Sequence, residues 1–274
     1  MKHILSRVRR AVEDYRMIEP GDRIAVGVSG GKDSLLALAA MKNLQRFYPK
    51  PFEVMAITLD LGSGGMDFSP IADFCETLGV PYQVEQTGIK QIVFDYRKEK
   101  NPCALCANLR RGALNNAAKA NGCNKVVLGH HYDDVVETFY LSLFFEGQLG
   151  CFSPVTYLTR SEITVLRPLI YVREKSIKKY AREASLPVVE NTCPAEGNSK
   201  RAYVKEVLCR LDKENRGLKD RAFTALVRSG LDGWRPQTED CSKRTEQMEP
   251  QKQETTKNNG NDTKVNHSST LQLP

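Results

Sequence analysis

The sequence predicts an α/β protein with a doubly wound, mostly parallel sheet and a small helical C-terminal part. Up to Phe145, apolar β-branched runs alternate with segments of helical periodicity. A turn rich in glycine and serine follows the first apolar run. Strands that alternate with helices pair in parallel, because each helix returns the chain to the starting edge of the sheet.

The part before Gly147 carries most of this pattern. Apolar side chains spaced by threes and fours predict a helix over residues 1–19, which Pro20-Gly21 ends. The apolar run at 23–28 predicts a buried strand. We also expect helices at residues 33–46, 69–78, 103–121 and 132–145, and strands at 53–60, 81–86 and 125–128.

Beyond Gly147 the pattern is looser. We expect a short strand at residues 164–169 and helices at 174–184, 200–211 and 221–227. From Asp240 the chain is rich in Gln, Lys, Thr, Asn and Glu and has almost nothing to bury, which predicts disorder.

Composition restricts the class of function. The 274-residue chain has a formal charge of +7, and the residues from Asp240 onward contribute about zero, so the excess lies in residues 1–239. This favours a polyanionic partner such as nucleic acid, although many enzymes carry a similar charge. With no apolar run of roughly 18–20 residues and no secretory signal, we expect a cytoplasmic protein without membrane contact. We then do not expect its eight cysteines to form disulfides, and the clustered ones are candidates for metal binding or catalysis.

The glycine-rich turn reads Val-Ser-Gly-Gly-Lys-Asp-Ser from Val28 to Ser34. Paired glycines let the backbone approach an anion, and N–H groups at a helix start can cradle phosphate. Lys32 and the hydroxyls of Ser29 and Ser34 add donors. Val26 stands where a Walker A motif needs glycine, and the sequence G-x-G-x-x-G is absent. The Walker A motif and the dinucleotide-binding motif are therefore excluded. The alternative is a tight turn without a ligand.

A second polar segment, residues 129–138, follows the strand expected at 125–128. Asp134, Glu137 and Thr138 fall at i, i+3 and i+4, which places them on one helical face. Carboxylates at the end of a strand can hold Mg²⁺ against ATP phosphates. Alternatively, Asp134 and its neighbour only cap the helix, where the helix dipole favours acidic side chains.

Three cysteines form the third candidate site. Cys103 and Cys106 open an expected helix, and Cys193 precedes a proline some ninety residues later. Thiols at a helix N-terminus have a lowered pKa and can share a metal. A redox pair, half of a zinc site and simple packing all remain open from the residues alone. We expect the isolated cysteines to be core or surface residues: Cys75, Cys123, Cys151 and Cys209.

These strings together resemble a known family. Ser29 to Ser34 matches the PP-loop of the N-type ATP pyrophosphatases, and segment 129–138 resembles their Gly-His-x-x-Asp-Asp-x-x-x-Thr string. The resemblance implies a Rossmann-like adenine nucleotide hydrolase fold that cleaves ATP to AMP and pyrophosphate. It implies catalytic roles for Lys32 and Asp134, the latter with Mg²⁺. The implied ATP-binding residues are Val28, Ser29, Gly30, Gly31, Lys32, Asp33, Ser34, Ile57, Leu59, Gly129 and Asp134.

The cysteines narrow the resemblance to the TtcA/TtuA family of tRNA 2-thiolation enzymes. It implies a 4Fe–4S cluster on Cys103, Cys106 and Cys193, with one iron left open for a sulfur donor. Arg110 stands one turn after Cys106, where relatives carry a catalytic lysine. Arginine keeps the charge but loses the titratable amine, so it implies charge stabilisation only. Zinc-ribbon cysteine pairs are missing, which leaves the modified tRNA position open.

The resemblance also implies four segments. Residues 1–20 form a basic amphipathic helix, 21–190 the PP-loop domain, 191–238 a helical extension with the third cysteine, and 239–274 a disordered tail.

The function implied is thiolation of a tRNA base. ATP adenylates the oxygen on C2, and sulfur from the cluster then displaces AMP. The implied partners are tRNA, a sulfur donor (a cysteine desulfurase or free sulfide) and a second copy of the chain. Two alternatives stay open: an amide-forming or lysidine-synthetase-like ligase that needs no cysteines, and a non-catalytic binding protein on the same fold.

Overall fold

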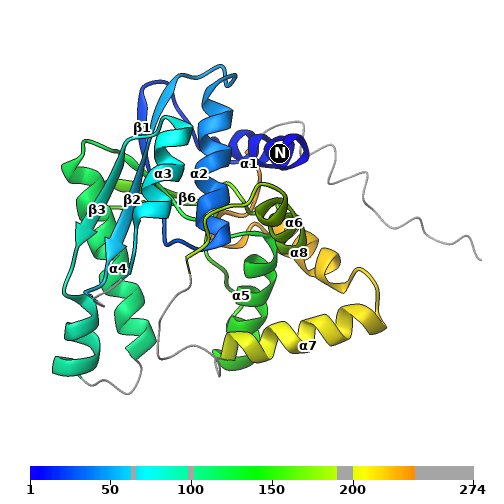
Figure 1. Cartoon of the computed structure of the whole chain (residues 1–274). Helices are drawn as coiled ribbons and strands as arrows, with labels where there is room; N and C mark the ends of the chain where they lie inside the picture. Colours follow the sequence, from blue (N-terminus) through cyan, green and yellow to red (C-terminus); the bar gives the residue numbers. More distant parts are fainter. Residues whose placement is uncertain (63–65, 98–101, 190–199, 238–274) are drawn as a thin grey trace, which may run out of the picture.

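The protein is built around one six-stranded sheet, seen in a computed structural model that describes residues 1–62, 66–97, 102–189 and 200–237. The strand order is β3-β2-β1-β4-β6-β5, and every neighbouring pair is parallel except β5 with β6. Helices lie on both faces of this sheet (Figure 1). The expected doubly wound α/β fold is confirmed.

The elements follow one another as the alternating pattern indicates. The strands are β1 Asp22–Gly27, β2 Phe52–Asp60, β3 Tyr82–Gln86, β4 Lys125–Val127, β5 Val155–Leu158 and β6 Ile163–Leu166. The helices are α1 Lys2–Asp14, α2 Lys32–Gln45, α3 Ser69–Leu78, α4 Pro102–Ala120, α5 Tyr132–Phe145, α6 Glu174–Glu183, α7 Lys200–Glu214 and α8 Leu218–Ser229, with a π-helix at Gln91–Arg97 and a 3₁₀ turn at Leu231–Gly233.

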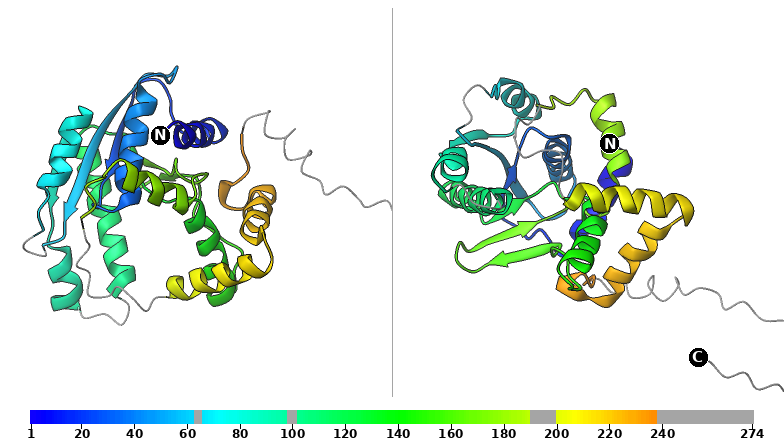
Figure 2. Two further views of the ribbon diagram at one scale, coloured as in Figure 1. Left: turned by 45° about the vertical axis from the view of Figure 1, so that its right-hand side comes forward. Right: turned by 90° about the horizontal axis from the view of Figure 1, so that it is seen from below.

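Alternate residues of β1 face opposite layers, as expected for a strand buried on both sides. Ile24 and Val26 belong to the larger core, which includes apolar side chains of α1, α2 and α6. Ala25 belongs to a second core, in which Leu114 and Ala118 of α4 cover the other face. Figure 2 shows α2 and α4 on opposite sides of the sheet.

Two sequence-based expectations about elements were wrong. The first helix ends at Asp14 rather than at residue 19, because Arg16 takes a positive φ of 46° and turns the chain out of the helix. Met17 and Ile18 still keep the apolar spacing, since both are fully buried in the core. The strand expected at 164–169 is β6, and the antiparallel strand β5 beside it was missed.

The C-terminal helices form a third small core with α5. Val204 and Leu208 of α7 pack with Tyr132 and Val136 of α5. The separate status of residues 191–238 stays a proposal, and the tail from 239 lies outside the described residues. In the described ranges, no helix combines the length and apolar character that a bilayer crossing requires.

Candidate nucleotide and cluster site

The site lies where the winding of the sheet reverses. From β1 the chain moves to β2 and β3 on one side, whereas β4 and β6 lie on the other side. Ligands of open α/β sheets bind outside the carboxyl ends of strands at such a switch point. Both segments singled out in the sequence follow these strands: the PP-loop, residues 28–34, follows β1, and residues 129–131 follow β4.

The PP-loop is held in shape by its own serines. The Ser34 hydroxyl donates to the Gly31 carbonyl at 2.9 Å and accepts from the Ser29 N–H at 3.1 Å. Gly30 has a φ of +81°, a conformation that residues with a side chain rarely adopt. Helix α2 begins at Lys32, with Gly31 as N-cap and no side-chain cap. Its first N–H groups are therefore available to an anion.

Strand β2 supports this loop from the side. The Val28 N–H donates to the Ile57 carbonyl at 2.8 Å, and the Thr58 hydroxyl donates to the Val28 carbonyl at 2.8 Å. The Ile57 side chain is buried, and Leu59 packs against the α4 side of the sheet. The adenine and ribose contacts expected of Ile57 and Leu59 stay predictions.

Gly129 brings the end of β4 against the start of α2. A Cβ at this position would lie 2.9 Å from the Asp33 carbonyl carbon and 3.0 Å from the Ser34 nitrogen. Both are backbone atoms, so neither can swing away. Glycine at position 129 therefore allows the two segments of the site to lie this close together.

We predict that Gly129→Ala will displace the PP-loop. The forced contact should lower the free energy of unfolding by about 1–3 kcal/mol and weaken ATP binding. Thermal melting and calorimetric ATP titration measure the two effects. Gly112→Ala is the matched control, because nothing lies within 4 Å of a Cβ at Gly112. Wild-type ATP affinity in Gly129→Ala would contradict the interpretation.

Lys32 stands among charges from α2 and α6. Its Nζ lies 2.9 Å from an Asp33 oxygen and 3.5 Å from an oxygen of Glu174. Burial acts to raise the pKa of Glu174, but hydrogen bonds from Lys205 and Lys178 outweigh it and lower that pKa to about 2. Glu174 therefore stays ionised and orients the lysines around it.

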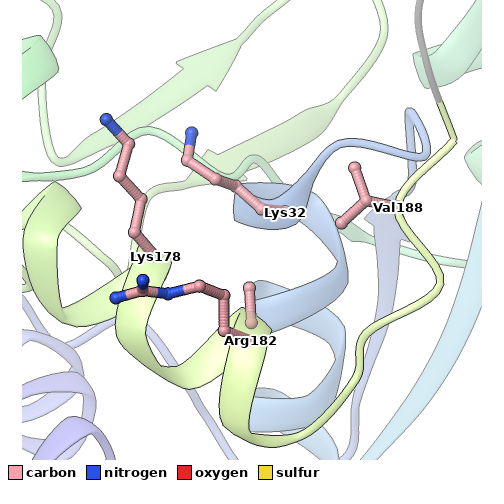
Figure 3. A pocket seen from close by; sticks show the side chains of 5 residues that line it. Lys32, Lys178, Arg182 and Val188 are labelled. Carbon is pink, nitrogen blue, oxygen red and sulfur yellow. The ribbon is translucent and has the colours of Figure 1, made fainter.

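A cavity of about 390 Å³ opens beside Lys32. Lys178, Arg182 and Val188 line it with Lys32, and in Figure 3 the amino groups of both lysines point to the same side. The cavity wall is almost entirely apolar, because the aliphatic parts of these side chains line it together with Ala181 and Val188. Lys178 and Arg182 were not predicted from the sequence. Their i, i+4 spacing on an expected helix nevertheless indicates that they lie on one helical face.

The acidic segment does cap its helix. His131 is the N-cap of α5: the Asp134 N–H donates to His131 Nδ1 at 3.4 Å, and the Asp134 carboxylate accepts from the His131 N–H at 2.9 Å. Asp133 accepts from the Glu174 N–H at 2.8 Å and so holds the start of α6. The capping alternative is therefore real, and a metal role for Asp134 stays a prediction.

Two carboxylate oxygens near Asp134 lack hydrogen bonds. Asp33 Oδ1 and Glu137 Oε1 are buried and have no hydrogen-bond partner within the described residues. Burial raises the pKa of Glu137 to about 7, even though Lys205 acts to lower it. Arg201 of α7 lies 3.9 Å from both Asp134 and Glu137. Asp33 Oδ1 lies 3.7 Å from His131 Nε2 and Glu137 Oε1 lies 4.0 Å from Lys205 Nζ. Carboxylate oxygens without a hydrogen bond are the kind of ligand that Mg²⁺ prefers.

His130 is a packing residue whose charge is suppressed. Its ring stacks on Phe152 with centroids 4.8 Å apart, and its Nδ1 is buried without a hydrogen bond. Burial lowers the pKa of His130 to about 4, and the positive charge of Arg167 acts in the same direction. The imidazole is therefore neutral at physiological pH.

This predicts a pH dependence of stability. Between pH 6.5 and about 4, the unfolded chain binds a proton at His130 and the folded chain does not, so stability falls as the pH falls. The expected loss is on the order of 3 kcal/mol. Denaturant unfolding of His130→Gln should show a flatter profile in this range. The exposed His3→Gln is the control, and identical profiles for all three proteins would refute the assignment.

The cysteine pair lies at the start of α4, which precedes the parallel strand β4 and therefore begins at the carboxyl ends of the strands, the same end at which the PP-loop follows β1. Cys103 is exposed and Cys106 is half-buried. In Figure 1 the strand arrows and the start of α4 lie toward the lower side of the molecule. Cys193 lies outside the described residues, so the meeting of the three sulfurs stays a prediction. In the described ranges, no three His, Cys, Asp or Glu side chains form a metal-binding group.

The remaining site predictions concern arginines. Arg110 is exposed on α4 and its role stays a prediction, while its neighbour Arg111 bonds to Asn108. Arg7 donates to the Tyr171 carbonyl, and Arg9 pairs with a glutamate on α1. Arg9 is exposed and its pair lies within α1, and Arg201 of α7 donates to the Thr138 hydroxyl in the acidic segment.

The fold and the loop at its switch point define a PP-loop protein of the nucleotide-binding kind. A family model described as a PP-loop domain matches residues 1–211. The tRNA-cytidine(32) 2-sulfurtransferase of Geobacter sulfurreducens is 41% identical over 228 residues, which cover 82% of this chain and 89% of the relative. The enzyme of the same name from Shewanella pealeana is 40% identical over 82% of this chain and 73% of the relative.

A solved structure supports the fold. The U34-tRNA thiolase NcsA from Methanococcus maripaludis, determined with its [4Fe-4S] cluster, matches with a TM-score of 0.69 and 23% identity over 83% of this chain and 77% of that one. This chain therefore belongs to the PP-loop family, within the group that contains the tRNA-cytidine(32) 2-sulfurtransferases.

Proposed function

We propose that this protein is an ATP-dependent tRNA 2-sulfurtransferase that acts in the cytoplasm on a cytidine of tRNA. The relatives at 40–41% identity carry that activity in their names. The observation that carries the proposal is that the start of α4, with the Cys103/Cys106 pair, lies at the same carboxyl end of the parallel strands as the PP-loop. A nucleotide and a sulfur-bearing centre would then reach one substrate base.

The first half of the reaction uses the switch-point loop. The O2 atom of cytidine attacks the α-phosphorus of ATP, pyrophosphate leaves, and AMP stays bonded to the base. Residues 29–34 hold the leaving pyrophosphate through backbone N–H groups, and Lys32 balances its charge. Asp134 would hold Mg²⁺, with the Asp33 and Glu137 oxygens that lack hydrogen bonds nearby.

The second half uses the cysteines. When bound, a 4Fe–4S cluster supplies sulfur that replaces the activated oxygen at C2, and AMP departs with that oxygen. Cys103, Cys106 and Cys193 would hold three irons as thiolates. Arg110, one turn further on, stabilises negative charge near C2. A cysteine desulfurase or free sulfide restores the sulfur, and we propose a homodimer as the working assembly.

Two measurements test this function. Anaerobic purification with iron and sulfide analysis should give about four of each per chain, as the proposed cluster requires. Mass spectrometry of tRNA nucleosides from a deletion strain should show that 2-thiocytidine is absent and returns with the wild-type gene. Loss of a 2-thiouridine instead would keep the chemistry and change the nucleotide. Zinc without iron, and unchanged thionucleosides, would reject the proposal.

A further inference from the structure

Arg167, directly after β6, is a buried cation without a counter-ion. Its side chain is only 9% exposed. Both of its hydrogen bonds run through Nη1, to the Ser153 carbonyl at 2.6 Å and to the Thr156 hydroxyl at 3.0 Å. No carboxylate in the described part of the chain contributes to its electrostatic surroundings. Buried charges are normally paired, so this guanidinium lacks a partner.

The edge of the Arg167 guanidinium formed by Nε and Nη2 has a defined geometry. Nε is buried and has no hydrogen-bond partner among the described residues. The N–H bonds of Nε and Nη2 point to the same side, and this fork matches two oxygens of a phosphate or carboxylate. The Cζ atom lies 5.1 Å from the centroid of the Phe152 ring, and the Nη1 contacts fix the plane. The fork is therefore held ready for an anion.

The surroundings add further positive charge. Burial lowers the pKa of Arg167 to about 10; Arg111 on α4 acts in the same direction, whereas Cys151 acts to raise it. Arg167 and the neighbouring His130 both contact the Phe152 ring, and burial and the charge of Arg167 keep this imidazole neutral. An anion at Arg167 would gain from its charge in a buried environment.

We propose that Arg167 binds a phosphate group of a substrate through its Nε–Nη2 edge. The inference deepens the proposed function and rests on it. Two sources share this chemistry: a phosphodiester of the tRNA and the α-phosphate of ATP. A ligand that reaches Nε needs a side-chain shift above it, of the kind that often accompanies binding.

Arg167→Lys tests the proposal, because lysine keeps the charge and removes the fork. The exposed Arg160→Lys on the β5–β6 turn is the matched control. Dissociation constants for a tRNA transcript and for ATP are measured with each protein, with thermal melting to monitor folding. We expect Arg167→Lys to weaken one of the two ligands about tenfold, while Arg160→Lys changes neither.

The two binding measurements distinguish the two possible sources of the phosphate group. Weaker tRNA binding with unchanged ATP binding assigns the phosphodiester, and the reverse assigns the nucleotide. Unchanged affinities for both ligands, with only a lower melting temperature, would show a purely structural arginine and overturn the proposal.

A second measurement uses the wild-type chain, in case Arg167→Lys does not fold. The Arg167 Nε–H resonance should shift on addition of tRNA, ATP or inorganic phosphate, and a resonance that none of them moves would overturn the proposal. A different measurement tests the proposed function itself. If that function is wrong, the wild-type protein will yield no thiolated nucleoside, whatever the affinities of Arg167→Lys.

Discussion

Cys106→Ser will abolish thiolation while leaving the nucleotide site intact. Serine is nearly isosteric with cysteine but does not ligate iron as a thiolate does. Thionucleoside formation should fall by more than about a hundredfold, because even hydrogen-bond partners of metal ligands cost about 10–100-fold when they are lost. The affinity for ATP should stay within about twofold, because Cys106 lies on α4 and the PP-loop precedes α2.

Cys209→Ser is the control for this experiment. Cys209 is another accessible thiol, exposed on α7, and it should keep full iron content and activity. Iron analysis, ATP titration and nucleoside mass spectrometry are carried out on both variants. Full thiolation by Cys106→Ser would remove the cluster from the mechanism and favour an amine-using ligase on the same fold.

The strands and helices around the loop follow closely from the sequence. Helix α5 has the expected bounds, because acidic residues near its start and the apolar run to Phe145 both mark it. Strand β5 was not predicted because it has only four residues, one of which, Tyr157, is 60% exposed. Alternation over so short a segment does not separate a strand from a loop.

Some residues of the site could likewise be predicted from the sequence, and others could not. The PP-loop was readable because adjacent residues make it, and its position after β1 is confirmed. Arg167 and His130 were not readable as neighbours, since their proximity depends on the pairing of β4 with β6. The capping box of Asp134 also needed coordinates, because the N-cap is a histidine and histidine is not a preferred cap.

Asp134 has two roles that one pair of substitutions can separate. Its carboxylate accepts from the His131 N–H, and it also faces Arg201 and the proposed Mg²⁺ site. Asparagine keeps an acceptor for the capping hydrogen bond but removes the charge. Asp134→Asn should therefore fold with near wild-type stability and lose about 10²–10³-fold in the rate of tRNA-dependent pyrophosphate release.

Asp134→Ala completes the comparison, since alanine removes the charge together with the capping hydrogen bond from the His131 N–H, while the His131 side chain can still accept from the N–H at position 134. It should lose the same activity and, in addition, about 0.5–1.5 kcal/mol of stability, the usual net contribution of one hydrogen bond. Pyrophosphate release and denaturant unfolding measure the two effects. If Asp134→Asn keeps its activity at low Mg²⁺ and Asp134→Ala fails only in stability, then Asp134 is a cap alone. The Asp33 and Glu137 oxygens that lack hydrogen bonds would then have to hold the metal without it.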